Sequence, residues 1–142
     1  MHVGVGLPNT LTGTDRGLLL EYAERADAGP FSSIGVFDRL RYDSLDPMGT
    51  LAACSGVTDD VRLATSIIAG PLRRNALLAK KTATVDVLSG GRLTVGLALG
   101  ARRDDYELAG VPYGERGRRF TEQLGALRDQ WESDEVGPDP VQ

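Results

Sequence analysis

Apolar residues along this chain gather in short runs that alternate with longer amphipathic segments. Four of the runs are rich in Val, Ile and Leu and are bounded by Gly, Pro or polar residues, which is the pattern of a buried β-strand. We expect these strands at residues 2–7, 32–37, 61–69 and 92–99. Because near-continuous apolar strands that alternate with helices are typical of a parallel sheet covered by helices, the pattern predicts an α/β fold.

Four helices are expected between and after these strands, from apolar residues at helical spacing and from capping signals. The first helix follows Thr14 or Asp15, and the second begins at Asp46-Pro47. The third covers residues 75–88, and the fourth lies around residues 120–131. The Arg-, Asp- and Gly-rich segment after the fourth strand is predicted to be a loop. The apolar positions expected to face inward are Leu19, Tyr22, Ala23 and Ala26, then Leu51, Ala52 and Cys54, then Leu78, Val85 and Leu88, and finally Phe120, Leu124, Leu127 and Trp131.

The strands recur at a regular interval. They begin near residues 2, 32, 61 and 92, a spacing of about 30 residues, which is the size of one βα unit. A (β/α)8 barrel of ordinary length divides into eight units of this size. We therefore expect residues 1–131 to form four βα units, the N-terminal half of a TIM barrel, and residues 132–142 to form an acidic, Pro-containing tail or linker.

Composition narrows the classes of function. The net charge of -4 offers no basic field for nucleic acid. A single cysteine, Cys54, and a single histidine, His2, leave little for a metal site or a catalytic triad. Cys54 lies in an apolar run, so a buried, inert thiol is expected rather than a nucleophile. No apolar run is long enough to cross a membrane and the N-terminus lacks the charged leader of a signal peptide, so a cytoplasmic location is expected.

Ligands of parallel βα proteins bind at the carboxyl ends of the strands, so the residues that follow each strand are the candidates for chemistry. Asp38 follows the second strand, where a carboxylate could bind a ligand or move a proton. The alternative is an ion pair with Arg39 or Arg41, or a loop cap. Gly100 follows the fourth strand, where it either lets the backbone approach a ligand or only turns the chain.

Other residues carry a weaker signal when taken alone. Ser66 and Ile67 lie inside the third strand, and nothing in their local pattern indicates a function. Three Arg pairs could bind phosphate, but solvated faces or ion pairs with Asp104, Asp105 and Glu122 are the more ordinary interpretation. These pairs are Arg73-Arg74, Arg102-Arg103 and Arg118-Arg119.

The central block of the chain resembles the bacterial luciferase-like flavin monooxygenase superfamily, whose members use FMN or the deazaflavin F420. The block, residues 61–100, reads VRLATSIIAGPLRRNALLAKKTATVDVLSGGRLTVGLALG. Further matches are GVFDRL after the second strand and GVPYGERGRRFTEQLGALRDQW before the tail. The resemblance covers residues 1 to about 131 and implies a (β/α)8 barrel with the flavin ring over the carboxyl ends of the strands.

The resemblance also implies roles for individual residues. Asp38 matches the family's acidic position near the ring or substrate and would be catalytic and cofactor-binding, while Arg39 stands where many members carry His. Ser66-Ile67 aligns with a non-proline cis peptide that presses against the flavin ring. Ala98 and Gly100 match positions of the fourth strand that line the ring. The implied reactions are hydride transfer, or oxygenation through reduced flavin and O2, with the cofactor supplying the chemistry.

Members of this family run to roughly twice the length of the chain, and their second half supplies strands five to eight and most of the phosphate site. The sequence therefore predicts the N-terminal half of a flavin-dependent oxidoreductase, with a small-molecule substrate, no metal and either a homo-oligomer or a complementing C-terminal half as partner. The alternative is a non-catalytic half-barrel that associates through its exposed strand edges. A third interpretation, an unrelated βα protein that binds another phosphate compound, lacks a Gly-rich phosphate loop. Whether the chain is catalytic, which cofactor and substrate it uses, and whether O2 reacts stay open.

Overall fold

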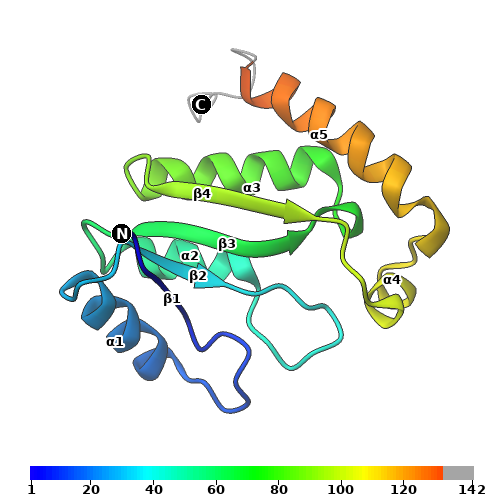
Figure 1. Ribbon diagram of the computed structural model, residues 1–142. Helices are drawn as coiled ribbons and strands as arrows, with labels where there is room; N and C mark the ends of the chain where they lie inside the picture. Colours follow the sequence, from blue (N-terminus) through cyan, green and yellow to red (C-terminus); the bar gives the residue numbers. More distant parts are fainter. Residues whose placement is uncertain (133–142) are drawn as a thin grey trace, which may run out of the picture.

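A four-stranded parallel sheet forms the centre of the computed structural model, which describes residues 1–132 (Figure 1). The predicted tail therefore lies, apart from Glu132, outside the described residues. The strands follow one another in chain order across the sheet, and each pairs in parallel with the next. They are β1 (Gly4–Gly6), β2 (Ser33–Val36), β3 (Arg62–Ala69) and β4 (Leu93–Ala98). The predicted α/β fold of four βα units is thus confirmed.

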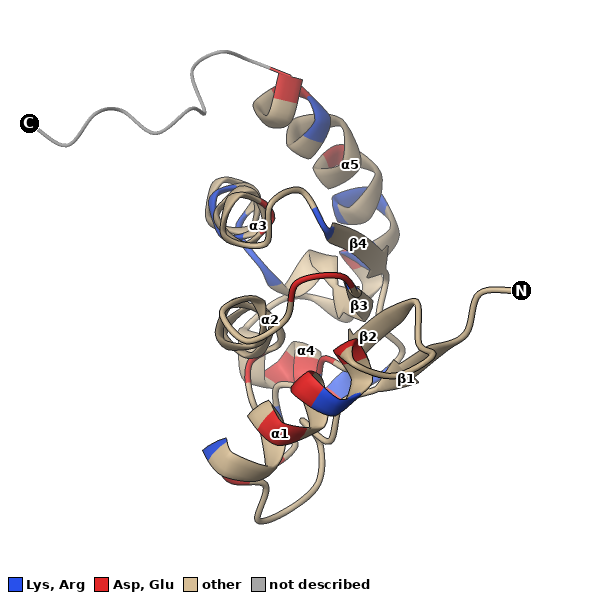
Figure 2. Cartoon of the chain, turned by 90° about the vertical axis from the view of Figure 1, so that its left-hand side faces the viewer, with Lys and Arg blue, Asp and Glu red and all other residues tan. Residues whose placement is uncertain are grey.

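Helices connect the strands and cover one side of the sheet. Figures 1 and 2 show α1, α2 and α3 together on that side, with α5 beside α3 and β4, and no described helix on the other side. The helices are α1 (Arg16–Asp27), α2 (Pro47–Ser55), α3 (Asn75–Leu88), α4 (Arg103–Ala109) and α5 (Arg116–Glu132), and the short 3-10 helices are η1 (Gly70–Leu72) and η2 (Tyr113–Glu115). None of the helices within residues 1–132 is long and apolar enough to cross a membrane.

Capping residues set the ends of the helices as the sequence predicts. The Asp15 carboxylate accepts the Leu18 N–H at 2.8 Å, and the Asp46 carboxylate accepts the Gly49 N–H at 2.8 Å, ahead of Pro47 at the first helical position. These bonds satisfy amide groups that have no partner inside the helix. After α3, Gly90 and Gly91 take φ values of 65° and 82°, the left-handed conformation that turns the chain back into β4.

The hydrophobic core lies between the sheet and the helices. Ile34 and Val36 of β2, and Leu63 and Ile68 of β3, are fully buried against this layer. The helices contribute, among others, Leu19, Ala23, Ala26, Leu51, Cys54, Leu78, Val85 and Leu127, as predicted. Burial raises the pKa of the Cys54 thiol to about 11, which keeps it protonated at neutral pH.

Four of the residues predicted to face inward are instead exposed: Tyr22, Leu88, Leu124 and Trp131. Leu88 is the last residue of α3, where the chain turns away toward Gly90. Leu124 and Trp131 of α5 line an open groove beside the free edge of β4, together with residues of α3. Leu124 and Trp131 lie on the apolar side of α5 that the helical period predicts, but no element among the described residues covers that side.

The segment after β4 was predicted to be a loop and is a helix, α4. Acidic residues in its first turn, Asp104 and Asp105, favour the helix N-terminus. Gly110, with φ 65°, supplies a left-handed C-cap. Tyr106 is 1% exposed, and its burial holds the short helix against the carboxyl end of β4.

Most side chains on the uncovered face of the sheet are small, with Arg62 and Ile67 of β3 as exceptions. Since successive side chains of a strand point to opposite faces, the residues that alternate with the buried Ile34, Val36, Leu63 and Thr65 lie on this face. They include Ser33, Gly35, Arg62, Ala64, Ser66, Thr94 and Gly96. A Cβ atom placed on Gly35 would lie 3.7 Å from the Ser66 Cβ, which puts Ser66 on the same side despite the irregularity in β3.

Candidate functional site

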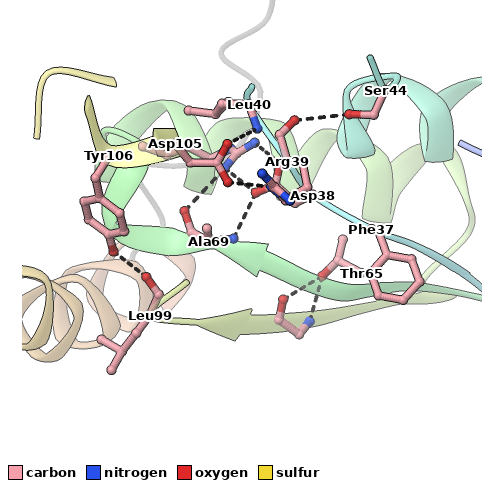
Figure 3. A network of polar contacts seen from close by, with 12 residues as sticks. Phe37, Asp38, Arg39, Leu40, Ser44, Thr65, Ala69, Leu99, Asp105 and Tyr106 are labelled. Atoms are coloured by element: carbon pink, nitrogen blue, oxygen red, sulfur yellow. Dashed lines mark hydrogen bonds and ion pairs between the residues drawn. The ribbon is translucent and has the colours of Figure 1, made fainter. Parts of the chain in front are cut away.

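Asp38 lies directly after β2, and its carboxylate is fully engaged within the chain (Figure 3). It accepts two hydrogen bonds from the Arg73 guanidinium, at 2.5 and 2.7 Å, and one from the Ala69 N–H at 2.9 Å. The side chain is 2% exposed. Because the bidentate ion pair is buried, it fixes the end of β2 to the end of β3 and to the turn that carries Arg73.

This geometry decides between the alternatives that the sequence left open for the partner of Asp38. An ion pair forms, but with Arg73 rather than with Arg39 or Arg41. The carboxylate would have to leave Arg73 and Ala69 before it could act as a base. Its catalytic role therefore stays a prediction, whereas its contacts already position the last residues of β3.

Ser66 and Ile67 are joined by a cis peptide bond, the only one among residues 1–132. This is the conformation that the family resemblance implied. The register between β3 and β4 shifts here, between Thr65 and Ile68. Ser66 is exposed on the uncovered face of the sheet, and Ile67, at 38% exposure, presents an apolar side chain to the same region.

Thr65 carries the strand pairing across this irregularity, and sequence reasoning missed it. Its hydroxyl donates to the Gly96 carbonyl at 2.9 Å and accepts the Gly96 N–H at 2.8 Å (Figure 3). The side chain thereby replaces two backbone bonds between β3 and β4. A threonine within a strand is common, so the sequence held no signal for this role.

Ala98 and Gly100 line a hollow beside Ile67 at the carboxyl end of β4. The volume of the hollow is about 640 Å³, and its walls are mostly apolar. Gly100 has φ 72°, and a Cβ atom there would lie 3.0 Å from the Ala69 Cβ. The wall residues are Ile67, Leu97, Ala98, Leu99, Gly100, Ala101, Tyr113, Arg116 and Phe120. Of the predicted site residues, the hollow thus brings together Ile67, Ala98 and Gly100, but neither Asp38 nor Ser66.

Positive charge lies at one side of the hollow, around Tyr113. The guanidinium carbon of Arg116 lies 3.8 Å from the centre of the Tyr113 ring, and that of Arg103 lies 4.4 Å from it. Arg116 also donates to the Tyr113 carbonyl at 2.8 Å. Tyr113 and Arg116 belong to the segment GVPYGERGRR, where the sequence indicated only a helix start, and Arg103 is the first residue of α4. The stacking holds a cation at the rim of an apolar wall.

Arg39 connects the loop after β2 to α4. Its Nε donates to the Asp105 carboxylate at 2.7 Å, and one of its Nη atoms lies 3.3 Å from Asp104. The buried Asp105 carboxylate also accepts the N–H groups of Leu40 and Arg41, at 3.1 and 2.8 Å. Arg39 therefore acts as an ion-pair partner, and a guanidinium cannot take the proton-transfer role of a histidine.

The predicted ion pairs between the Arg pairs and Asp104, Asp105 and Glu122 form only in part. Arg118 pairs with Glu122 at 2.8 Å and with Glu115 at 3.1 Å on the exposed face of α5. Asp104 and Asp105 pair with Arg39 rather than with a neighbouring Arg. Within residues 1–132 no group of three or more His, Cys, Asp or Glu side chains could hold a metal ion.

Comparison with known proteins identifies the family of this chain. The sequence profile of the luciferase-like monooxygenases matches residues 1–139. The chain belongs to the luciferase-like monooxygenase family. The family resemblance read from residues 61–100 is thereby confirmed.

Relatives in this family include proteins with named cofactors. An uncharacterized protein of Mycobacterium tuberculosis is 42% identical over 94 residues, which are 66% of this chain and 33% of that protein. The oxygenase component of a flavin-dependent trigonelline monooxygenase of Acinetobacter baylyi is 29% identical over 121 residues, 82% of this chain and 34% of its own length. The chain thus spans about a third of these relatives.

Solved structures share the fold. The monooxygenase RslO1 from Streptomyces bottropensis superposes with a TM-score of 0.83 at 26% identity, over 99% of this chain and 46% of that one. An F420-dependent secondary alcohol dehydrogenase in complex with an F420-acetone adduct superposes with a TM-score of 0.76 at 25% identity, over 94% of this chain and 43% of that one. The four βα units described here therefore correspond to less than half of each enzyme.

Proposed function

We propose that this chain forms the ring-binding wall of a flavin-dependent or deazaflavin-dependent oxidoreductase. The observation that carries the proposal is the meeting of Ile67, Ala98 and Gly100 around one apolar hollow at the carboxyl ends of β3 and β4. Relatives that are named flavin-dependent and F420-dependent support the choice of cofactor class. The choice between FMN and F420 stays open, as does the substrate.

The residues of the hollow fit a flat, largely apolar ring. Gly100 leaves the backbone uncovered where a side chain would project, and Ile67 offers an apolar surface for contact. Arg116, held on Tyr113, places a positive charge at the rim, which suits an anionic group of the ligand. When bound, the cofactor would supply hydride transfer, or oxygenation with O2.

Asp38 has a positioning role in this proposal. Through the Ala69 N–H and Arg73 it fixes the segment that carries Ile67. The sequence also predicts that Asp38 contacts cofactor or substrate. For such a contact its carboxylate would have to give up its bonds to Arg73 and Ala69. A cytoplasmic location likewise stays a prediction.

Binding of oxidised FMN and of F420 to the full chain, measured separately by fluorescence, tests the proposal. We expect weak binding of one of the two, because the chain spans less than half of the related enzymes. Ala98→Phe fills the hollow and should abolish that binding, whereas Ala76→Phe on the exposed surface of α3 should leave it unchanged. Circular dichroism checks that both variants fold.

Two results would contradict the proposal. One is the absence of binding of either cofactor up to its solubility limit. The other is unchanged binding to the folded Ala98→Phe variant, which would place the ligand away from the hollow.

A further inference from the structure

Two arginines at the rim of the hollow have no negatively charged partner among residues 1–132. We propose that Arg103 and Arg116 form an anion subsite there, which binds a carboxylate or phosphate group of a ligand whose apolar part lies in the hollow. The proposal rests on the proposed function, because it takes the hollow as the ligand site, and it adds the chemical class of that ligand. The acidic group belongs either to the cofactor or to the substrate.

Both arginines stack on the ring of Tyr113. The guanidinium carbons of Arg103 and Arg116 lie 4.4 and 3.8 Å from the ring centre. They occupy opposite faces of the ring, because two guanidinium groups cannot stack on the same face of one phenol ring. The ring of Tyr106, which is buried, meets the Tyr113 ring edge to face, with 5.2 Å between the ring centres. The aromatic platform that carries the two cations is therefore anchored in the fold.

Stacking leaves most N–H groups of the two guanidinium groups unpaired. Arg116 makes one hydrogen bond, from an Nη atom to the Tyr113 carbonyl at 2.8 Å, and Arg103 makes none with residues 1–132. A guanidinium has five N–H donors in a planar fork, which matches the two oxygens of a carboxylate or phosphate. The donors at this rim are thus available for such a group.

The carboxylates that neighbour the two arginines in the sequence are engaged elsewhere. Asp104, which follows the first arginine, lies 3.3 Å from an Nη atom of Arg39. Glu115, which precedes the second, lies 3.1 Å from an Nη atom of Arg118. Two like charges on one ring repel each other. Because no carboxylate of the described chain offsets them at ion-pair distance, an anion bound at the rim would remove this imbalance.

The hollow determines the rest of the ligand. Its volume is about 640 Å³ and its walls are mostly apolar. Arg116 belongs to these walls, so it would contact the acidic group directly. Arg103 lies behind the Tyr113 ring and adds positive charge there. An organic anion with an apolar ring satisfies both parts of the site, whereas a neutral ligand leaves both cations without a partner.

Binding of two matched pairs of compounds to the full chain tests the proposal. FMN and riboflavin share one ring system and differ by a phosphate group, and phenyl phosphate and phenol differ in the same way. Fluorescence measures the flavins, and ligand-observed NMR measures the phenyl compounds. We expect the charged member of at least one pair to bind about tenfold more tightly than the neutral member, or better, as for a charge-assisted hydrogen bond. A preference in the flavin pair assigns the acidic group to the cofactor, and one in the phenyl pair alone assigns it to the substrate.

Variants locate this preference in the chain. Arg116→Gln removes the direct donor and should abolish the preference for the charged member, and Arg103→Gln should reduce it in part. Arg128→Gln makes the same change of charge at an exposed position farther along α5 and should leave the preference unchanged. Circular dichroism checks that each variant folds.

Equal affinities within both pairs would overturn the proposal, as would a preference that survives in the folded Arg116→Gln variant or is lost equally in Arg128→Gln. Failure of the proposed function has a different signature: neither flavin binds, although phenyl phosphate is still preferred to phenol. If FMN and riboflavin bind equally and the phenyl compounds show no preference, the proposed function stands and the anion subsite fails. Absence of binding by all four compounds would overturn both.

Discussion

Thr65 gives the sharpest test of how the irregular part of β3 is held. Replacing it by valine keeps the shape of the side chain and removes the hydroxyl. Both bonds to Gly96 are lost, so a donor and an acceptor of β4 face β3 without a partner. The Thr65 side chain is 3% exposed, so water cannot readily replace the hydroxyl. With about 0.5–1.5 kcal/mol for each bond and an added cost for the unpaired groups, the expected loss of unfolding free energy is about 2–4 kcal/mol.

Urea denaturation followed by circular dichroism measures this loss. Thr65→Ser is the matched control, because it removes the methyl group and keeps the hydroxyl. It should lose less stability than Thr65→Val, although valine buries more apolar surface. One contrary result is a free energy of unfolding for Thr65→Val within about 0.5 kcal/mol of the wild-type value. The other is a larger loss of stability in Thr65→Ser than in Thr65→Val. Either result would mean that the hydroxyl does not hold β3 to β4 at this irregularity.

Three further predictions concern other sites. Gly96→Ala should prevent native pairing of β3 and β4, because its Cβ would collide with the Thr65 carbonyl oxygen. Gly125→Ala in α5 has open space around it and should raise the midpoint of thermal unfolding. Equal midpoints for the two variants would refute the collision. Burial works to raise the pKa of Asp27, but the N–H groups of residues 59–61 hold that pKa below its usual value. A lowered pKa stabilises the fold above the pKa of the unfolded state, so stability should fall below about pH 4, and urea titrations should show a smaller fall for Asp27→Asn. Cys54 should react with a thiol reagent only upon unfolding, and fast labelling of the folded chain would contradict its burial.

The sheet and its order could be predicted because the signals are local. Strand runs, the caps at Asp15 and Asp46 and the glycine turn after α3 each lie within a few residues of the structure that they specify. Leu124 and Trp131 show the limit of such reasoning. Periodicity identifies the apolar side of a helix, but it does not reveal whether another layer covers that side.

The site was less predictable because its contacts are long-range. The family resemblance led to the cis peptide at Ser66-Ile67 and to Ala98 and Gly100 beside the hollow. It did not indicate that Asp38 would pair with Arg73, 35 residues away, because a carboxylate next to two arginines has nearer partners in the sequence. An ion pair is decided by which strand ends meet in space, and that follows only from the assembled sheet.

The contacts of Asp105 also determine the order in which the chain can complete its carboxyl-end surface. The loop after β2 is held by N–H bonds from Leu40 and Arg41 to a side chain that lies 65 and 64 residues further along the chain. During synthesis this loop emerges long before its anchor. Because residue 105 follows all four strands in the chain, the loop after β2 cannot take its final position until the whole described sheet has been synthesised. The surface that would receive a ligand is completed only then.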